Sequence, residues 1–238
     1  MRLTQMIIVS LMISHATAFA EDPNEFRAYI DGHGFVNGSF ISEPKSKTFP
    51  TDTGVYLLPY PGFGGVGGGG GMSLGIGWQA VSLDIGFDWS SDQAEGRIDG
   101  FTYTMSQTTQ HIPLTLRLEV PNLMVRPSLI AGVDWVSTSN PKLEKPSNYV
   151  INPPLLDPKE DSYTAWRFGF GFDFMINDRL RVPFRLIAIY APIDRSDLTD
   201  YIKEETGPTG LTTGFKYRSK WEWQPQVTLG LTYDFHLF

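Results

Sequence analysis

The chain has no cysteine and few basic residues. Its 238 residues include 0 Cys, and 19 Lys and Arg stand against 26 Asp and Glu, for a formal net charge of −7. Without cysteine there is no disulfide framework and no residue for lipid attachment, so we do not expect a lipoprotein. A nucleic-acid partner requires a basic surface, so the acidic balance argues against one.

Long hydrophobic runs are missing beyond the first residues. Residues 1–20, MRLTQMIIVSLMISHATAFA, combine an early charge at Arg2, an apolar run around Met6 to Ile13 and small residues at Ala18 and Ala20. This run is shorter than the roughly 20 apolar residues of an anchor helix. The segment is typical of a signal peptide cleaved after Ala20, which leaves residues 21–238 as one mature domain. Cleavage removes one basic residue, so 18 basic and 26 acidic residues remain and the net charge becomes −8.

No later stretch is apolar enough to cross a bilayer as a helix, which excludes a helical inner-membrane protein. The chain shows alternation instead. In Thr164–Ile176, TAWRFGFGFDFMI, one parity is largely aromatic and the other is small or charged. Successive side chains of a strand point to opposite faces. A strand with lipid on its apolar face and a polar lumen beside Arg167 and Asp173 fits this pattern.

The same alternation recurs and predicts an all-β fold, an eight-stranded antiparallel up-and-down transmembrane β-barrel. The expected strands are Phe26–Phe40, Met72–Trp78, Val81–Trp89, Ile112–Val120, Val125–Trp135, Thr164–Ile176, Leu180–Tyr190 and Phe215–Phe238. Turns of about 2–4 residues alternate with loops of about 16–26, which is typical of short periplasmic turns and long extracellular loops. The expected loops are Ile41–Gly65, Ser90–Met105, Ser137–Ser162 and Pro192–Gly214, the last with one or two helical turns around Leu198 and Ile202.

The tryptophans support this topology. We expect all six to form aromatic girdles at the two membrane interfaces, where Trp is enriched. The loop-side girdle would contain Trp89, Trp135, Trp166, Trp221 and Trp223, and the turn-side girdle would contain Trp78.

If the apolar face of each strand meets lipid, the residues on the opposite face form a charge network in the lumen. Its cations would all be Arg, whose planar fork can hold two carboxylate oxygens at once. Because isolated charges in a narrow barrel are costly, the near balance of charges suggests mutual neutralisation. The predicted network contains Arg27, Asp31, Asp84, Asp88, His111, Arg117, Glu119, Arg126, Asp134, Arg167, Asp173, Arg181, Arg185 and Asp234.

Strand pairing predicts particular neighbours in this network. If the strands pair tightly across Pro121–Met124, Glu119 lies opposite Arg126 and His111 lies opposite Asp134. Directly opposed residues approach to about 4.5–5.5 Å at Cβ, close enough for charge-assisted pairs.

The next hairpin gives a second set of expected neighbours. With Phe174 opposite Val182, Asp173 lies diagonal to both Arg181 and Arg185. A slip of one residue would turn all of these charges into lipid.

Pro113 is expected midway along its strand with the ring inward. A closed barrel has no edge strand, so this proline removes a ladder donor. We expect a bulge around Gln110 to Leu114. We also consider a weak seam there, through which an apolar molecule could enter sideways.

Over nearly all its mature length the chain resembles the small outer-membrane β-barrel proteins of Gram-negative bacteria, the OmpA/OmpX/OmpW-like group. The resemblance rests on AFA before Glu21, on HIPLTLRLEV at His111–Val120 and on the final LTYDFHLF. It implies location in the outer membrane, contact with outer-membrane lipid and lipopolysaccharide, and delivery by the barrel-assembly machinery. Tyr233, Phe235 and Phe238 would form the assembly signal.

The expected function is structural or surface-interacting, with the lumen filled by its charges, because eight strands leave an interior just wide enough for side chains. A narrow pore or lateral-access channel for a small or apolar solute is the alternative, and a lipid A-modifying enzyme is a third possibility. No GxSxG signature is present, and His33 near Asp31 reads as a hydrogen-bonded wall residue. We expect no catalytic residue, cofactor or metal, and any surface ligand is left open.

Overall fold

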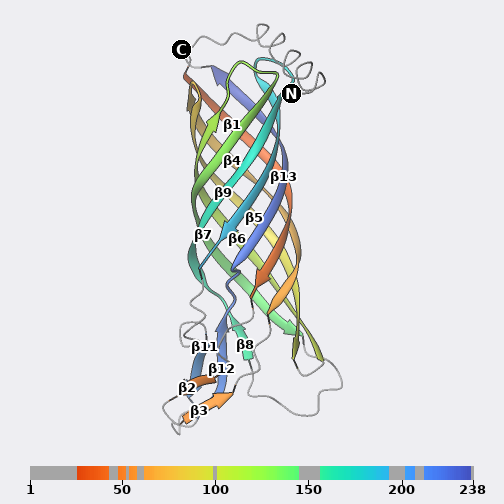
Figure 1. Ribbon diagram of the computed structural model, residues 1–238, viewed down its shortest axis with the longest axis vertical. Coiled ribbons are helices and arrows are strands. Elements are labelled where there is room, and N and C mark those ends of the chain that lie inside the picture. The colour runs from red at the N-terminus through yellow and green to blue at the C-terminus, as the bar shows by residue number, and fades with distance from the viewer. Residues whose placement is uncertain are drawn as a thin grey trace, which may run out of the picture.

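The computed structural model describes residues 26–42, 48–51, 54–57, 62–98, 101–144, 156–192, 202–206 and 212–236. Eight strands form a closed barrel in the order β1-β13-β10-β9-β7-β6-β5-β4, and all neighbours are antiparallel (Figure 1). The strands are β1 (Phe26–Ile41), β4 (Phe63–Trp78), β5 (Val81–Ile98), β6 (Phe101–Glu119), β7 (Val125–Glu144), β9 (Ser162–Met175), β10 (Leu180–Tyr190) and β13 (Trp223–His236). The predicted eight-stranded antiparallel barrel is confirmed. The signal peptide lies outside the described residues.

The five strands of the described residues that are not part of the barrel are short, and they lie beyond its loop-side end (Figure 1). β2 (Thr48–Thr51) pairs with β3 (Gly54–Leu57), while β11 (Ile202–Thr206), β12 (Thr212–Arg218) and β8 (Leu156–Lys159) form a three-stranded sheet. The predicted helical turn at Ile202 is therefore wrong, because this residue begins a strand paired with β12. Leu198 lies outside the described residues. No helix among the described residues is long and apolar enough to cross a membrane.

The predicted loop Ser90–Met105 is wrong. β5 continues to Ile98 and β6 begins at Phe101, so most of this segment extends the barrel wall. Likewise, β7 continues to Glu144 inside the predicted loop Ser137–Ser162. The prediction failed because the outward residues stop being apolar, while the alternation of inward and outward side chains continues.

The polarity of the wall inverts along β5. The outward side is apolar up to Trp89, and then Ser91, Gln93, Glu95 and Arg97 are exposed. The inward side changes in the opposite sense, because polar residues give way to buried apolar side chains. We call this inward set the apolar cap: Ile41, Phe63, Ala94, Tyr103, Met105, Val136, Ile189, Ala191 and Trp221, each 0–5% exposed. The loop-side part of the barrel is therefore built like a water-soluble barrel.

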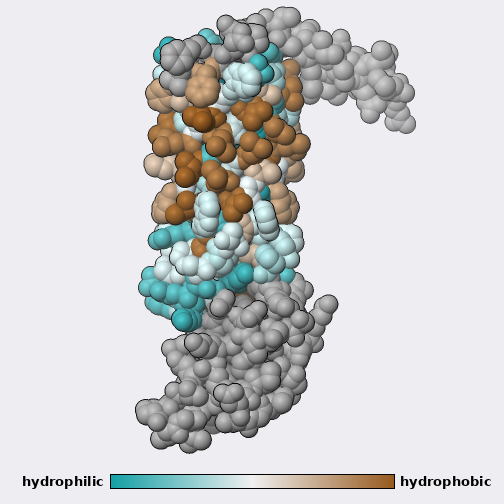
Figure 2. All heavy atoms as spheres, turned by 90° about the vertical axis from the view of Figure 1, so that its left-hand side faces the viewer, coloured by the Kyte–Doolittle hydropathy of each residue, from teal (hydrophilic) through white to brown (hydrophobic). Residues whose placement is uncertain are grey.

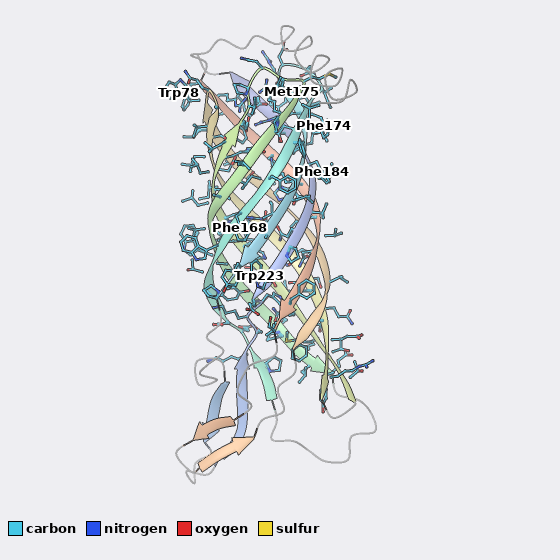
Figure 3. The ribbon with its side chains drawn as sticks, in the orientation of Figure 1. Trp78, Phe168, Phe174, Met175, Phe184 and Trp223 are labelled. Atoms are coloured by element: carbon cyan, nitrogen blue, oxygen red, sulfur yellow. The ribbon has the colours of Figure 1, made fainter. Side chains whose placement is uncertain are left out.

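A lipid-facing belt surrounds the rest of the wall. Figure 2 shows hydrophobic side chains over the part of the barrel nearer the turns, and hydrophilic ones towards the opposite end. Trp78 lies at the turn-side end and Trp223 much nearer the loops (Figure 3). Five tryptophans are 37–60% exposed on the outside, namely Trp78, Trp89, Trp135, Trp166 and Trp223. Such a belt is what a bilayer would cover.

Trp221 was assigned wrongly to the girdle, because its side chain is 1% exposed and belongs to the apolar cap. The predicted strand Phe215–Phe238 is interrupted between β12 and β13. At the interruption the Ser219 amide donates to the Lys159 carbonyl at 3.1 Å and the Glu222 amide donates to the Phe40 carbonyl at 2.9 Å. With these bonds, the segment between β12 and β13 does not follow the alternation of the barrel wall.

The β9–β10 register was predicted correctly, with Val182 paired to Phe174. The β6–β7 register is two residues away from the prediction, because Glu119 pairs with Ser128 and His111 with Val136. A shift of two preserves the parity, so the predicted charges still face inward.

The cause of this shift is a longer turn. The Val120 amide donates to the Pro127 carbonyl at 3.0 Å, while the Met124 carbonyl accepts from Met175 of β9 at 2.9 Å. Asn122 adopts a left-handed φ of 62° within this turn. The chain therefore needs more residues to reverse than a tight pairing across Pro121–Met124 would leave.

Pro113 lies inward as expected, but the predicted bulge around Gln110 to Leu114 is wrong. The β5–β6 register is the same on both sides of the proline, with Ile85 paired to Leu114 and Asp88 to His111. Only the two pairs between them are missing. The register shift on β6 lies instead between Ser106 and Thr108, on the β7 side.

A proline facing a glycine marks each gap of this kind in the described barrel ladders. The registers place Pro113 opposite Gly86, Pro225 opposite Gly38 and Pro183 opposite Gly230, and the ladder skips two pairs at each position. Proline cannot donate to the ladder. A glycine leaves room for its ring, because a Cβ on Gly86 would lie only 3.2 Å from Pro113 Cγ.

Candidate functional site in the barrel lumen

The structure places all fourteen predicted network residues inside the barrel, where they are 0–8% exposed. They come from every barrel strand except β4, and their contacts form two polar layers. The turn-side layer contains Arg27, Tyr29, Asp84, Arg117, Glu119, Arg126, Asp173, Arg181 and Asp234. The middle layer contains Asp31, His33, Asp88, His111, Asp134, Arg167 and Arg185.

Arg117 is the centre of the turn-side layer. Its Nη2 donates to Asp84 Oδ1 at 3.0 Å and to the Tyr29 hydroxyl at 2.7 Å, and its Nη1 donates to Asp173 Oδ2 at 3.1 Å. The Tyr29 hydroxyl in turn donates to Asp84. These contacts join β6 to β1, β5 and β9 across the lumen.

Arg181 binds the remaining acids of this layer. It lies 2.7 Å from Asp173, 3.1 Å from Asp234 and 3.4 Å from Glu119. Arg27 Nη2 reaches the same Glu119 at 2.5 Å. Glu119 therefore binds two arginines of other strands, and its opposite residue in the ladder is Ser128, not Arg126 as predicted.

Arg126 has another ladder partner than predicted, whereas Arg181 and Arg185 are both diagonal to Asp173 as predicted, because Asp173 pairs with Pro183. Arg126 is paired with Asp173 in the β7–β9 register and is 1% exposed. From this diagonal position the Arg185 guanidinium extends to the middle layer, where it lies 3.2 Å from Asp31.

His33 connects two carboxylates of the middle layer. Its Nδ1 lies 2.6 Å from Asp31 Oδ1 and its Nε2 lies 3.0 Å from Asp88 Oδ1. Thr232 donates to Asp31 at 2.6 Å, and Arg167 donates to Asp88 at 2.7 Å. The layer therefore spans the lumen from β13 and β1 to β5 and β9.

His111 and Asp134 are diagonal neighbours, with His111 Nδ1 3.0 Å from Asp134 Oδ2. Both are fully buried. Arg167 Nη1 lies 3.7 Å from the same carboxylate, which links this pair to the rest of the middle layer.

A third polar layer was missed from the sequence. Asp92 is 1% exposed and accepts hydrogen bonds from Asn37 at 2.7 Å, Ser90 at 3.1 Å and Thr109 at 2.5 Å. We call these four residues the outer layer. Asp92 lies in the wrongly predicted loop, although it shares the parity of Asp88 and could have been found by continuing the alternation.

The apolar cap lies beyond the outer layer, towards the loop-side end of the barrel. The Trp221 amide donates to the Tyr163 hydroxyl at 3.2 Å. Gln107 donates to the Ser219 carbonyl at 3.1 Å, and the Ser219 and Thr138 hydroxyls are 2.7 Å apart. The segment before β13 is thus tied to β6, β7 and β9 at the mouth of the barrel.

The glycine-rich strand β4 makes space for the network. A Cβ on Gly75 would lie 2.2 Å from Tyr29 Cζ, and one on Gly71 would lie 2.3 Å from Asp88 Oδ1. The inward glycines of β4 are therefore explained by packing inside the barrel. Side chains from β1 and β5 occupy the space that β4 leaves.

One small cavity separates the turn-side and middle layers. It has a volume of about 40 Å³ and is bordered by Pro113, Arg117, Arg167, Arg185 and Thr228, among others. The buried Nε atoms of Arg167 and Arg185 and Oγ1 of Thr228 have no protein partner. This volume has room for about three water molecules, which would satisfy such atoms.

His33 is not placed to act as a catalytic base. Both ring nitrogens of His33 contact carboxylates, so neither is available to activate a hydroxyl nucleophile. In the part of the chain that the structure describes, no group of three or more His, Cys, Asp or Glu residues is arranged to hold a metal ion.

The family follows from a match over most of the chain. The model of the outer membrane protein beta-barrel domain matches residues 6–235. The chain belongs to this family. It is therefore a protein of the Gram-negative outer membrane, as the resemblance implied. No curated protein sequence matches it.

Solved structures to which the chain is similar include OprG, OprF and OmpT. OprG from Pseudomonas aeruginosa is 13% identical, with 90% of this chain and 98% of that chain covered and a TM-score of 0.48. The N-terminal barrel of OprF from the same organism is 14% identical, with 88% and 97% covered and a TM-score of 0.36. The outer membrane protease OmpT from Escherichia coli is 11% identical, with 92% and 100% covered and a TM-score of 0.38.

The proposed assembly signal lies at the turn-side end of β13 in this outer-membrane barrel. Tyr233 and Phe235 are 38% and 48% exposed on the lipid side, and their ring centroids are 4.9 Å apart. Phe238 lies outside the described residues. Recognition by the assembly machinery stays a prediction.

Proposed function

We propose that this protein is a closed, non-conducting barrel that presents its extended strands at the cell surface. The observation that carries the proposal is that buried ion pairs cross the lumen and buried apolar side chains lie beyond them at the loop-side end, which we take as two barriers in series. One barrier is the stack of polar layers, and the other is the apolar cap.

The polar layers obstruct the lumen because their pairs join distant strands. Arg27 of β1 binds Glu119 of β6, and Arg167 of β9 binds Asp88 of β5. Each pair connects strands three places apart in the ring. A passing solute would have to separate buried ions, and leaving a buried charge unpaired costs about 3–5 kcal/mol.

The apolar cap is a second and chemically different obstacle. Met105 and Trp221 are 0% and 1% exposed at the loop-side end. Hydrophobic constrictions exclude water and ions without requiring any charge. An ion that passed the polar layers would therefore still meet a dry segment.

A surface role fits the outer wall. Beyond Trp89, the outward residues of β5 and β6 are polar, as illustrated by Gln93, Glu95 and Thr104. A folded wall projecting from the membrane offers a rigid surface for a partner. The chemistry of that partner is left open.

The lateral-access alternative rests on the ladder gap at Pro113. The ring of Pro113 packs over Gly86 on the inward face of the wall. We therefore assign the gap an architectural role, and we propose no enzymatic activity for the lumen.

Solute flux into liposomes tests the proposal. We expect the refolded protein to give no osmotic swelling with small sugars or amino acids. Because either barrier alone should suffice, Arg167→Ala with Arg185→Ala should remain closed, as should Met105→Ala with Trp221→Ala. Only the combination of all four changes should leak.

Heat-modified migration in gels would verify that each variant forms a barrel. Swelling by the folded wild-type protein would contradict the proposal. Uptake of apolar probes alone, without swelling by polar solutes, would favour the lateral route.

A further inference from the structure

A groove crosses the lipid-facing wall near the loop-side end. Its volume is about 800 Å³, and its lining comes from β1, β4, β9, β10 and β13. The floor consists of small outward residues in one row, Gly38, Pro225 and Ala188. Ala188 pairs with Pro225, and the β1–β13 register puts Gly38 opposite Pro225.

An aromatic row borders the groove on the loop side. Trp166 pairs with Tyr190, Tyr190 with Trp223, and Trp223 with Phe40. The rings of Tyr190 and Trp223 are 4.4 Å apart. Since interfacial aromatics mark headgroup level, the groove lies just inside the outer-leaflet hydrocarbon.

An aliphatic and aromatic row borders the groove on the turn side. Phe170, Leu186, Val227 and Val36 are connected pair by pair across β9, β10, β13 and β1. The floor is therefore lower than both borders because its side chains are smaller. The groove therefore results from a row of small residues that lies between two rows of larger ones.

A second groove lies on the other side of Phe168 and Phe170. It measures about 500 Å³ and is lined by Leu116, Leu118, Leu129 and Ala131 together with the two phenylalanines, which line both grooves. Phe168 also contacts Trp223 edge to face, with centroids 6.2 Å apart, and Figure 3 shows both residues. The two phenylalanines thus form a ridge between two apolar grooves.

We propose that the ridge and its grooves bind lipopolysaccharide, with acyl chains of one molecule on both sides of Phe168 and Phe170. The outer leaflet supplies the ligand, because the first groove begins directly below the loop-side aromatic row. A lipid with several chains on one headgroup fits a divided site. This inference depends on the outer-membrane location and not on a closed lumen.

A cation lies near the expected headgroup. Lys220 precedes β13, and its Nζ donates to the Pro192 carbonyl at 2.7 Å and lies 5.3 Å from the Tyr163 ring centroid. Pro192 follows β10, the strand that carries Ala188, whereas Tyr163 faces inward on β9, so Lys220 lies at the loop-side rim of the barrel. An ammonium at this position is suited to a lipid phosphate.

Co-purification measures the binding. The full barrel is extracted from outer membranes in mild detergent, and bound lipopolysaccharide and phospholipid are counted by native mass spectrometry. We expect about one lipopolysaccharide per wild-type barrel. Ala188→Phe, which fills the floor, should lower this occupancy at least fivefold, and Lys220→Gln should lower it about threefold.

Gly32→Phe is the matched control. Gly32 faces outward on β1 like Gly38, and no atom lies within 4 Å of its Cβ position. This variant should keep wild-type occupancy. Equal retention by Ala188→Phe and wild type, equal loss in both phenylalanine variants, or phospholipid as the only bound lipid would overturn the proposal. Heat-modified migration identifies any variant that has not folded, and Ala188→Leu then replaces Ala188→Phe.

Discussion

Arg181 Nη1 lies 2.7 Å from Asp173 Oδ2, and both side chains are fully buried. This contact spans the β9–β10 hairpin diagonally, as the sequence register requires. Asp173 also accepts from Arg117 at 3.1 Å. One carboxylate therefore serves arginines from two strands.

Removal of that carboxylate should destabilise the barrel strongly. Asp173→Asn removes one charged acceptor from Arg181 and one from Arg117, which keep Asp234 and Asp84 as partners, so we expect a loss of about 1.5–3 kcal/mol in the free energy of unfolding. Urea unfolding of the barrel in lipid vesicles would measure it. Glu95→Gln, at an exposed position, should change the value by less than about 0.5 kcal/mol. Similar values for both variants would contradict the network.

His33 should carry hydrogen on both ring nitrogens. Its Nδ1 and Nε2 both contact carboxylates, and an ionised carboxylate can only accept a hydrogen bond. Nitrogen-15 NMR at neutral pH should therefore show an imidazolium signal for His33. His33→Phe removes this signal and identifies it, and it should cost about 1–3 kcal/mol in unfolding free energy. A non-protonated nitrogen at His33 would refute the arrangement.

The glycines of β4 should not tolerate a side chain at inward positions. A Cβ at Gly75 would approach Tyr29 Cζ to 2.2 Å, and overpacking of this kind costs about 1–3 kcal/mol. Gly75→Ala should therefore lower unfolding free energy by that amount. Gly32→Ala, with open space around its Cβ, provides the comparison. The explanation fails if the two substitutions are equally tolerated.

Pro113→Thr should stabilise the barrel by restoring a ladder donor, at about 0.5–1.5 kcal/mol for one hydrogen bond. Thermal unfolding would measure this gain. Uptake of an apolar fluorescent probe should stay unchanged, since the Pro113 ring already packs over Gly86. Lower uptake together with the gain in stability would instead support the lateral route.

The orientation in the membrane can be tested with single cysteines, because the chain has none. Glu95→Cys should react with a membrane-impermeant maleimide on intact cells, since Glu95 lies on the loop-side wall. Asp178→Cys, in the β9–β10 turn, should react only after the outer membrane is disrupted. The opposite result would invert the topology.

The lipid-facing half of the barrel was predicted well from the sequence, because apolar outward residues alternate there with polar or small inward residues. Apolar parity and a short turn predicted the β9–β10 register, with Phe172 opposite Phe184. The prediction failed beyond Trp89 because polarity inverts while the strands continue, and this hid Asp92. At β6–β7 the position of Asn122 in a longer turn shifted the pairing by two residues.

Contacts across the lumen could not be predicted from strand pairing. Arg117 and Asp173 are 56 residues apart, and Arg185 and Asp31 are 154 residues apart. Closure of the barrel decides which inward side chains meet, and closure depends on the tilt and stagger of all eight strands. The alternation therefore predicted which residues form the network, but not which of them contact one another.

Single-channel recording in a planar bilayer tests the closed lumen most directly. After insertion of the refolded protein, the account predicts a flat current trace with no discrete steps across a wide voltage range. Combined alanine variants at Arg167, Arg185, Met105 and Trp221 should produce steps and show that inserted barrels are detectable. Sustained wild-type openings whose conductance rises with salt concentration would contradict the account.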